Sequence, residues 1–368
     1  MTVAVDAMGG DHGPAVIVEG AVLAAREYGT EILLVGNETI LRKEMERFGA
    51  DNLPIRVKHC TEVVQMEETP SIALRKKRDS SIRVAVEAVK EGEAQAVVSA
   101  GHTGATLTAS TLILRPLKGI DRPAIATFLP TVKGLCVLLD AGANVDCKST
   151  QLFQFGIMGS VFAKYILNRP NPRVGLLGIG EEESKGNEIT REAFQMFKQS
   201  SINFIGNVEG KAVYRGVSDV IVCDGFLGNV ALKISESLAE MVEKSLRDVF
   251  SHNIFSKLGY LLVKRRFAAM KKRMDYSEYG GAPLLGINGV CIICHGGSTP
   301  KAIKNAIPMA QRMADTGLSN HIEEDIEADV ETHGANHRRG TFWSNIRQSF
   351  SFSMERKGKV QPHGSHQE

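Results

Sequence analysis

Five polar, glycine-containing segments each follow a short apolar run and precede a helix-like pattern. They lie at 7–14, 101–105, 178–187, 225–229 and 295–300. A strand, a glycine loop and a helix in this order are typical of an open α/β sheet, in which ligands bind outside the carboxyl ends of the strands. One such loop is weak evidence, but five at equivalent places predict one shared cleft.

Apolar runs and helical patterns alternate along most of the chain. We expect strands at 2–6, 31–36, 54–58, 95–100, 123–129, 135–140, 173–178, 202–206, 219–223 and 288–294. We expect helices at 14–28, 38–48, 69–91, 103–114, 149–167, 188–200, 226–251 and 299–316. Strands separated by helices indicate βαβ units and a mostly parallel sheet. The 368 residues are enough for a substantial core and two lobes.

Composition narrows the class of protein. Hydrophobic residues make up 43% of the chain and charged residues 23%, as in ordinary soluble proteins. A formal net charge of +2 is too small to indicate a nucleic-acid-binding protein. The sequence enters a strand at once, without the pattern of a secretory signal, and no apolar run approaches the roughly 20 residues that cross a bilayer. We therefore expect a cytoplasmic protein that is soluble or at most peripheral to a membrane.

Six scattered cysteines fit a reducing cytoplasm. Cys291 and Cys294 have the spacing of a metal or redox pair. They lie in an expected strand, however, where an odd offset sends side chains to opposite faces. We expect buried thiols and no metal site.

The segment 253–274 breaks the alternation of strands and helices. It combines an apolar stripe with seven basic residues and no acid, and it follows another helical stretch. We expect a protruding helical hairpin at about 230–275. Its stripe packs on the body or a partner subunit, or it lies on anionic lipid or an acidic partner. The candidate membrane or carrier contacts are Leu258, Leu262, Lys264, Arg265 and Arg266.

The end of the chain has a different composition. An acidic segment at 323–331 precedes a stretch rich in Ser, His, Gly and basic residues. We expect the catalytic unit to span 1–330 and the tail 331–368 to be disordered. Apolar residues at helical spacing, from Phe342 and Trp343 to Met354, leave a weakly lipid-seeking helix as an alternative.

Six ordered motifs together carry a family resemblance. They are DAMGGDHGP at 6–14, SAGHTGA at 99–105, LDAGAN at 139–144, GEEESKGNE at 180–188, CDGFLGN at 223–229 and GVCIICHG at 289–296. Over about residues 2–320 the chain closely resembles the bacterial phosphate acyltransferases of the PlsX family, which make acyl-phosphate from acyl-acyl carrier protein and inorganic phosphate. The family usually has asparagine in place of His102, and Gly-Ser-Ser where this chain has Gly-Gly-Ser at 296–298.

The resemblance implies a homodimeric, two-lobed α/β/α fold similar to isopropylmalate dehydrogenases and phosphotransacetylases. It also implies a place at the entry to phospholipid (phosphatidic acid) synthesis, at the inner face of the membrane beside a glycerol-3-phosphate acyltransferase. The partners so implied are acyl carrier protein, inorganic phosphate and an anionic membrane surface. No cofactor is implied.

Phosphate attack on a thioester needs an anion cradle, a donor for the developing oxyanion and an apolar path for the acyl chain. Lys185 is the best candidate cation, because such pre-placed charge is usually a large catalytic term; an ion pair with Glu181, Glu182 or Glu183 is the alternative. His295 is a candidate donor to the oxyanion or acid for the leaving thiolate, and Asp224 is taken as the third catalytic residue. We expect the aspartates at 6, 11, 140 and 224 to orient loops rather than touch phosphate.

The glycine loops supply the other candidates for phosphate or substrate binding: Gly9, Gly10, Ser99, Gly101, His102, Thr103, Asn144, Asn229, Gly296 and Ser298. Backbone N–H groups where helices begin near 103 and 299 favour anions. Ordinary helix capping by Thr103 and Ser298 is the alternative for those two hydroxyls.

Three alternative functions remain open. A metal- and nicotinamide-dependent decarboxylating dehydrogenase fits the fold class, although no G-x-G-x-x-G follows the first strand. A membrane-surface adaptor built on a retired enzyme fold is the non-enzymatic alternative. An acyl-CoA-dependent phosphotransacetylase is the nearest enzyme alternative, since sequence alone separates acyl donors poorly.

Overall fold

A computed structural model describes residues 1–334 of the chain, with side chains at all of these positions except 276 and 330–334. The strands are β1 Thr2–Asp6, β2 Glu31–Gly36, β3 Ile55–His59, β4 Ala96–Ser99, β5 Ala124–Thr131, β6 Gly134–Leu139, β7 Val174–Gly178, β8 Phe204–Glu209, β9 Val220–Val222, β10 Ala282–Leu285 and β11 Val290–Ile293. Within the described residues they form one sheet of eleven strands, in the order β3-β2-β1-β4-β11-β10-β5-β6-β9-β7-β8. The expected tail, including Phe342 and Trp343, lies almost wholly outside the described residues.

The sheet is mostly parallel, as predicted, but its direction changes in the middle. The pairs β11–β10, β10–β5 and β5–β6 are antiparallel, and the other pairs are parallel. Three reversals make β6, β9, β7 and β8 run opposite to β1, β4 and β11. The glycine loops therefore fall into two groups, one on each half of the sheet, rather than along the single edge that a fully parallel sheet would give.

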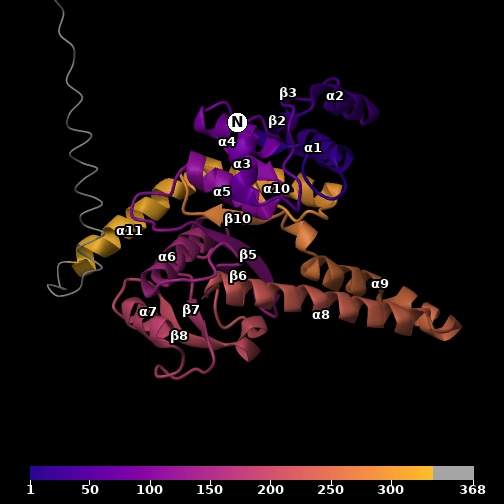
Figure 1. Cartoon of the computed structure of the whole chain (residues 1–368). Coiled ribbons are helices and arrows are strands. Elements are labelled where there is room, and N and C mark those ends of the chain that lie inside the picture. Colours follow the sequence, from indigo (N-terminus) through magenta and orange to yellow (C-terminus); the bar gives the residue numbers. More distant parts are fainter. Residues whose placement is uncertain (335–368) are drawn as a thin grey trace, which may run out of the picture.

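Helices cover both faces of the sheet (Figure 1). They are α1 Pro14–Tyr28, α2 Glu38–Arg47, α3 Pro70–Lys76, α4 Ser81–Lys90, α5 Thr103–Ile113, α6 Ser149–Tyr165, α7 Glu188–Lys198, α8 Gly225–Ser251, α9 Ile254–Met274, α10 Pro300–Asp315 and α11 Leu318–Gly334, with short 3-10 turns η1 Gly210–Arg215 and η2 Tyr276–Glu278. One hydrophobic cluster joins α1, α6, α7, α10 and α11 to one sheet face. A second joins α3, α4 and α5 to the opposite face. The expected α/β/α fold with a mostly parallel sheet is confirmed.

The strand alternation accounts for the cysteine pair. Cys291 packs in the cluster under α5, whereas Cys294 packs in the cluster on the other face. Both thiols are free and buried, and burial raises the pKa of each to about 12. The prediction of buried thiols is confirmed.

Three elements differ from the sequence prediction. The expected helix at 69–91 is two helices, because residues 79 and 80 turn aside to pair with 61 and 62: the Asp79 carboxylate accepts from the Thr61 amide at 2.7 Å, and Ser80 forms a β-bridge with Glu62. Strand β10 was not predicted, since it is short and contains a proline. The acidic segment 323–331 is part of α11, which packs on α6.

Helix α6 is buried on nearly all sides. Leu152, Phe155 and Met158 lie along one face of the helix, and Phe153 and Ile157, which lie off that face, are buried as well. The sheet, α7 and α11 enclose this helix, so almost every side of it is covered. Its core joins the phenylalanines of α6 and α7, with ring centroids of Phe153 and Phe197 5.3 Å apart.

Helices α8 and α9 form the predicted hairpin, which projects from the body of the molecule (Figure 1). The aromatic side chains of Phe250, Tyr260 and Phe267 pack together in tilted and edge-to-face contacts in its far part, with centroids 5.4–5.9 Å apart. No residue of α9 is buried. Among the described residues, no helix is both long and apolar enough to span a bilayer.

Candidate active site

The first group of loops follows β1, β4 and β11, which are neighbours in the sheet. Their backbones are in contact: a Cβ built on Gly9 would lie 2.5 Å from the Cα of Gly101, and the Asp11 amide donates to the Gly296 carbonyl at 2.8 Å. Only glycine permits so close an approach. Gly10 also has a φ of +88°, a conformation that favours glycine. The glycines at 9, 10, 101 and 296 thus assemble this group of loops.

Asp6 and Ser99 fix the loop after β4 through buried hydrogen bonds. Both side chains are buried. The Ser99 hydroxyl donates to the Asp6 carboxylate at 2.7 Å and accepts from the Gly101 amide at 3.1 Å. Burial raises the pKa of Asp6, against the hydrogen bonds that lower it. The prediction that Asp6 orients a loop fits these contacts. Phosphate binding by Ser99 stays a prediction. In this structure the Ser99 hydroxyl donates its hydrogen bond to Asp6 rather than toward a phosphate site.

Two histidines accept from backbone N–H groups in or beside the helix starts where we expected an anion to bind. His102 is the N-cap of α5, and its Nδ1 accepts from the amides of Gly104 at 3.1 Å and Ala105 at 3.4 Å. His295 Nδ1 accepts from the Gly297 amide at 3.0 Å. A neutral imidazole that accepts at Nδ1 carries its proton on Nε2. The loop backbone therefore fixes the tautomer of each ring.

Helices α5 and α10 are not capped by Thr103 and Ser298, the two hydroxyl residues considered as alternative caps. Thr299, not Ser298, caps α10, with its Oγ1 accepting from the Ala302 amide at 3.3 Å. Thr103 is the first residue of α5, and its side chain is exposed. The Ser298 side chain is only 2% exposed, and its Oγ has no hydrogen-bond partner among the described residues.

The second group of loops follows β6, β9 and β7, again neighbours in the sheet. Asp140 is buried, and its carboxylate accepts from the amides of 125, 142, 143 and 144 at 2.7–3.1 Å. The Asn144 side chain donates to Asp140 and to the Pro123 carbonyl at 2.9 and 2.8 Å. Burial raises the pKa of Asp140. Asn144 is thus held within the loop, and its proposed contact with substrate stays a prediction.

The start of α8 packs directly on this loop. Asp224 is the N-cap and accepts from the Leu227 amide at 2.8 Å. A Cβ built on Gly228 would lie 1.8 Å from the Asp140 carbonyl oxygen. Asn229 is exposed and faces Gly142. Asp224 therefore positions α8, and a direct catalytic role for it stays a prediction.

Lys185 lies in the β7 loop with an exposed side chain. Its amide donates to the Glu182 carbonyl at 3.0 Å, but among the described residues no carboxylate lies within 4.0 Å of its ammonium group. Glu183 instead pairs with Lys198 at 3.0 Å, and Glu181 lies 3.8 Å from Lys211. The ion pair that we weighed against a catalytic role is not formed.

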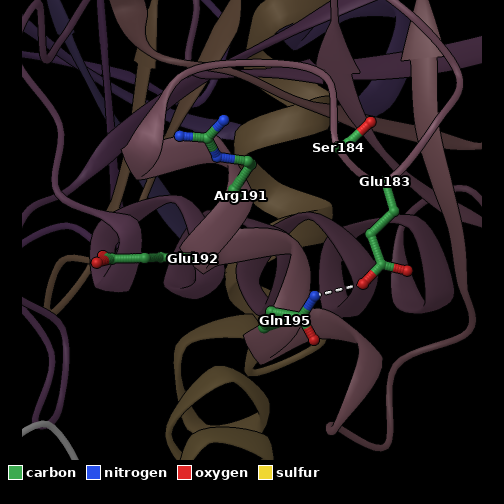
Figure 2. A pocket seen from close by; sticks show the side chains of 5 residues that line it. All are labelled: Glu183, Ser184, Arg191, Glu192 and Gln195. Atoms are coloured by element: carbon green, nitrogen blue, oxygen red, sulfur yellow. Dashed lines mark hydrogen bonds between the residues drawn. The ribbon is translucent and has the colours of Figure 1, made fainter.

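Figure 2 shows the side chain of Glu183 held by a side chain of α7. Its carboxylate accepts from the Gln195 amide on α7, at the side of an open depression of about 560 Å³. Ser184, Arg191 and Glu192 line the same depression. Two of the three acids of this loop, Glu183 and Glu181, are thus engaged by α7 and by Lys211, and within the described residues Lys185 forms no ion pair with the third, Glu182.

A shared hydrophobic cluster connects the two groups of loops. Ala105 and Ala109 of α5 pack in the same cluster as Ala141, with Ala143 of the β6 loop and Leu232 of α8 against it. The two groups are therefore joined on the sheet face that carries α5. Leu258, Leu262, Lys264, Arg265 and Arg266 all lie exposed on α9, on the hairpin.

Two residues that shape the site were not predicted from the sequence. The cap role of Thr299 was missed, although Thr before Pro is a common start of a helix. Thr106, whose hydroxyl donates to Ser99 at 3.2 Å, was missed because nothing in its pattern separates it from other helix residues.

Comparison with known proteins identifies the family. A family described as "Fatty acid synthesis protein" matches residues 1–321. A phosphate acyltransferase of Geotalea uraniireducens is 54% identical over 327 residues, which cover 89% of this chain and 94% of the relative. The chain belongs to the phosphate acyltransferase family. A second member, from Geobacter sulfurreducens, is 54% identical over 329 residues, 89% of this chain and 95% of its own length.

Solved structures support the fold of this acyltransferase. A phosphotransacetylase from Streptococcus pyogenes has a TM-score of 0.59 at 18% identity, covering 85% of this chain and 94% of its own. A branched-chain phosphotransacylase from Enterococcus faecalis has a TM-score of 0.55 at 14% identity, covering 85% and 99%. At such identities the likeness concerns the fold alone.

Proposed function

We propose that this phosphate acyltransferase transfers a fatty acyl group from acyl-acyl carrier protein to inorganic phosphate, and that the acyl-phosphate serves phospholipid synthesis. The buried Ser298 hydroxyl at the start of α10 is the observation that carries the proposal. Leaving a buried hydroxyl unpartnered costs about 1–3 kcal/mol. A phosphate oxygen bound between the β4 and β11 loops would accept its proton.

The phosphate is held mainly by side chains. The amides of 104, 105 and 297 already donate to imidazoles, so they add a favourable dipole rather than direct bonds. The hydroxyls of Thr103 and Ser298 and the Nε2–H of His102 are the donors on this side.

In the reaction, a phosphate oxygen attacks the thioester carbonyl carbon, and the tetrahedral intermediate then loses the thiolate of the carrier. One C–O bond forms and one C–S bond breaks, and neither substrate is oxidised or reduced. Orientation of two substrates contributes up to about 7–11 kcal/mol to such a step. Lys185 stabilises the developing negative charge, which a pre-placed cation does without reorganisation.

His295 donates a hydrogen bond to the oxyanion in this proposal. Because its Nδ1 accepts from the Gly297 amide, the neutral ring offers Nε2–H as a donor. Full protonation would place a second N–H against that amide. Hydrogen bonding to the oxyanion therefore fits the loop better than proton transfer to the leaving thiolate.

The hairpin supports a place at the membrane surface. Its far end exposes Phe255 at 80% and Leu262 at 86%, with Leu258 between them. Lys264 and Arg265 lie nearby without ion pairs among the described residues. Exposed apolar side chains beside cations suit an anionic lipid surface. We propose peripheral attachment to the inner face of the membrane, beside a glycerol-3-phosphate acyltransferase that consumes the product.

A different surface supports a homodimer. Val230, Ile234, Leu238 and Met241 recur at helical spacing on α8, and all four are exposed in the single chain, Ile234 at 63%. An exposed apolar stripe of this kind is typical of a subunit contact. We propose that a second copy covers the α8 stripe, while the end of the hairpin remains available to lipid.

The proposal is tested by mixing the protein with phosphate and either acyl-acyl carrier protein or acyl-CoA, and trapping acyl-phosphate with hydroxylamine. We expect a hydroxamate with the carrier-bound donor and a lower kcat/KM with acyl-CoA. A preference for acyl-CoA would make the protein a phosphotransacetylase, and no product from either donor would refute the proposed reaction.

A further inference from the structure

A second basic surface lies on α3 and on the turn that follows it, apart from the hairpin. It consists of Ile72, Arg75, Lys76 and Arg78, all exposed, and we call it the α3 basic surface. Ile72 is 52% exposed, and Arg75 and Lys76 follow it by three and four residues, which places them on the same side of the helix. Among the described residues, none of its three cations forms an ion pair or a hydrogen bond.

Nearby acids do not neutralise this surface, because they have other partners. Glu68 accepts from Lys77 at 2.5 Å and from the Gln65 amide at 2.8 Å. Asp79 accepts from Thr61 at 2.7 Å. Lys77 turns inward, where its ammonium also donates to the Val63 carbonyl at 2.7 Å. Three of the four consecutive basic residues thus remain directed to solvent.

The α3 basic surface adjoins the phosphate side of the site. A Cβ built on Gly104 would lie 2.9 Å from the Pro70 ring and 3.2 Å from the His102 ring. Pro70 begins α3, so Arg75 is five residues farther along, or about 7.5 Å at the rise of a helix. The end of the hairpin is much more distant, since the 27 residues of α8 alone span about 40 Å.

We propose that the α3 basic surface docks the acidic carrier protein that delivers the acyl thioester. This rests on the proposed function and names the place where its donor binds. The cations face acidic side chains of the carrier, and Ile72 buries an apolar contact between them. Docking here sets the carrier beside the α5 N-terminus, where the thioester must meet phosphate. The cations of α9 then serve the membrane and not the carrier.

The test reverses the charges of the surface in the full-length protein with Arg75→Glu, Lys76→Glu and Arg78→Glu together. A matched control reverses three exposed cations elsewhere on the same half of the molecule, Lys43, Arg56 and Lys90. A third variant reverses Lys264, Arg265 and Arg266 on α9. Turnover is measured with acyl-acyl carrier protein and with an uncharged small thioester, acyl-N-acetylcysteamine, each with phosphate.

We expect the α3 variant to raise KM for the carrier-bound donor by about tenfold, since several exposed charge pairs are lost together. Its turnover of the small thioester should equal that of wild type, which also shows that the variant is folded. The wild-type KM for the carrier should rise with salt, and that of the α3 variant should rise less.

Failure of docking and failure of the proposed function give different results. If wild type forms acyl-phosphate from neither donor, the reaction itself is wrong. If wild type is active and the α3 variant keeps the wild-type KM for the carrier, or if only the α9 variant raises it, docking on α3 is refuted. A variant Ile72→Ala, with no charge change, should raise the same KM by a smaller factor; an unchanged KM would count against the apolar contact.

Discussion

Replacing Lys185 with alanine removes an exposed cation that forms no ion pair among the described residues. Stability should therefore change little, with a free energy of unfolding within about 0.5 kcal/mol of wild type. Catalysis should change greatly. Two unit charges 4 Å apart interact by on the order of 4 kcal/mol at an effective dielectric constant near 20, and loss of one pre-placed donor to an oxyanion lowers kcat by about 10²–10³. We expect kcat to fall by that factor.

The assay is hydroxylamine trapping of acyl-phosphate at saturating phosphate and donor, with thermal unfolding measured in parallel. Lys198→Ala is the matched control, because it removes the same charge from a lysine that is paired with Glu183 at 3.0 Å. This control should keep most of its turnover. Near wild-type turnover of the Lys185 variant would remove the lysine from the mechanism, and a large loss of stability would show that its role is structural.

Four further outcomes are expected. Because burial raises the pKa of Asp6, its folded-state pKa exceeds the unfolded value, and its contribution to stability is lost as pH rises through the folded-state pKa; wild type should therefore gain stability relative to Asp6→Asn as pH is lowered from neutrality toward the ordinary aspartate range, as urea unfolding would measure. Gly228→Ala should lower stability by about 1–3 kcal/mol, because its Cβ would meet a carbonyl oxygen at 1.8 Å, whereas Gly259→Ala on the hairpin, with open space around it, should raise the melting temperature slightly. Leu258→Glu with Leu262→Glu should weaken binding to anionic vesicles in a flotation assay while soluble turnover persists, and loss of the dimer with unchanged vesicle binding would instead make these leucines a subunit contact. Turnover should persist in a chelator and without nicotinamide, since acyl transfer from a thioester to phosphate is not a redox step and the described residues contain no cluster of three or more metal-ligating side chains; abolition by the chelator and rescue by magnesium would contradict this.

The elements with strong local patterns could be predicted from the sequence. The β1 and β4 strands are continuous apolar runs followed by glycine, and the hairpin has a long helical pattern with its own composition. Strand β10 could not be predicted, because four residues with a proline give no periodic signal and pairing with β5 and β11 holds them. The break between α3 and α4 depends on the contact of Asp79 with Thr61, which is 18 residues away in sequence.

The candidate residues could be named, but their partners could not. Sequence spacing indicates that His102 opens a helix, yet whether its ring meets a ligand or its own backbone depends on a rotamer that the sequence does not fix. The structure directs Nδ1 to the amides of Gly104 and Ala105. Lys185 is the reverse case: three neighbouring acids suggested an ion pair, and contacts from α7 and η1 remove two of those acids from consideration.

The position of β11 has a consequence for synthesis of the chain. It lies between β4 and β10 in the sheet, although about 190 residues separate it from β4 in the sequence. At about 5–20 residues per second, the ribosome takes roughly 10–40 s to supply it. Until then the nascent chain presents one side of β4 as an unpaired edge, a template for pairing with other chains. The emerging protein should therefore depend on a chaperone, or on a low concentration of nascent chains, during this interval more than its finished sheet would suggest.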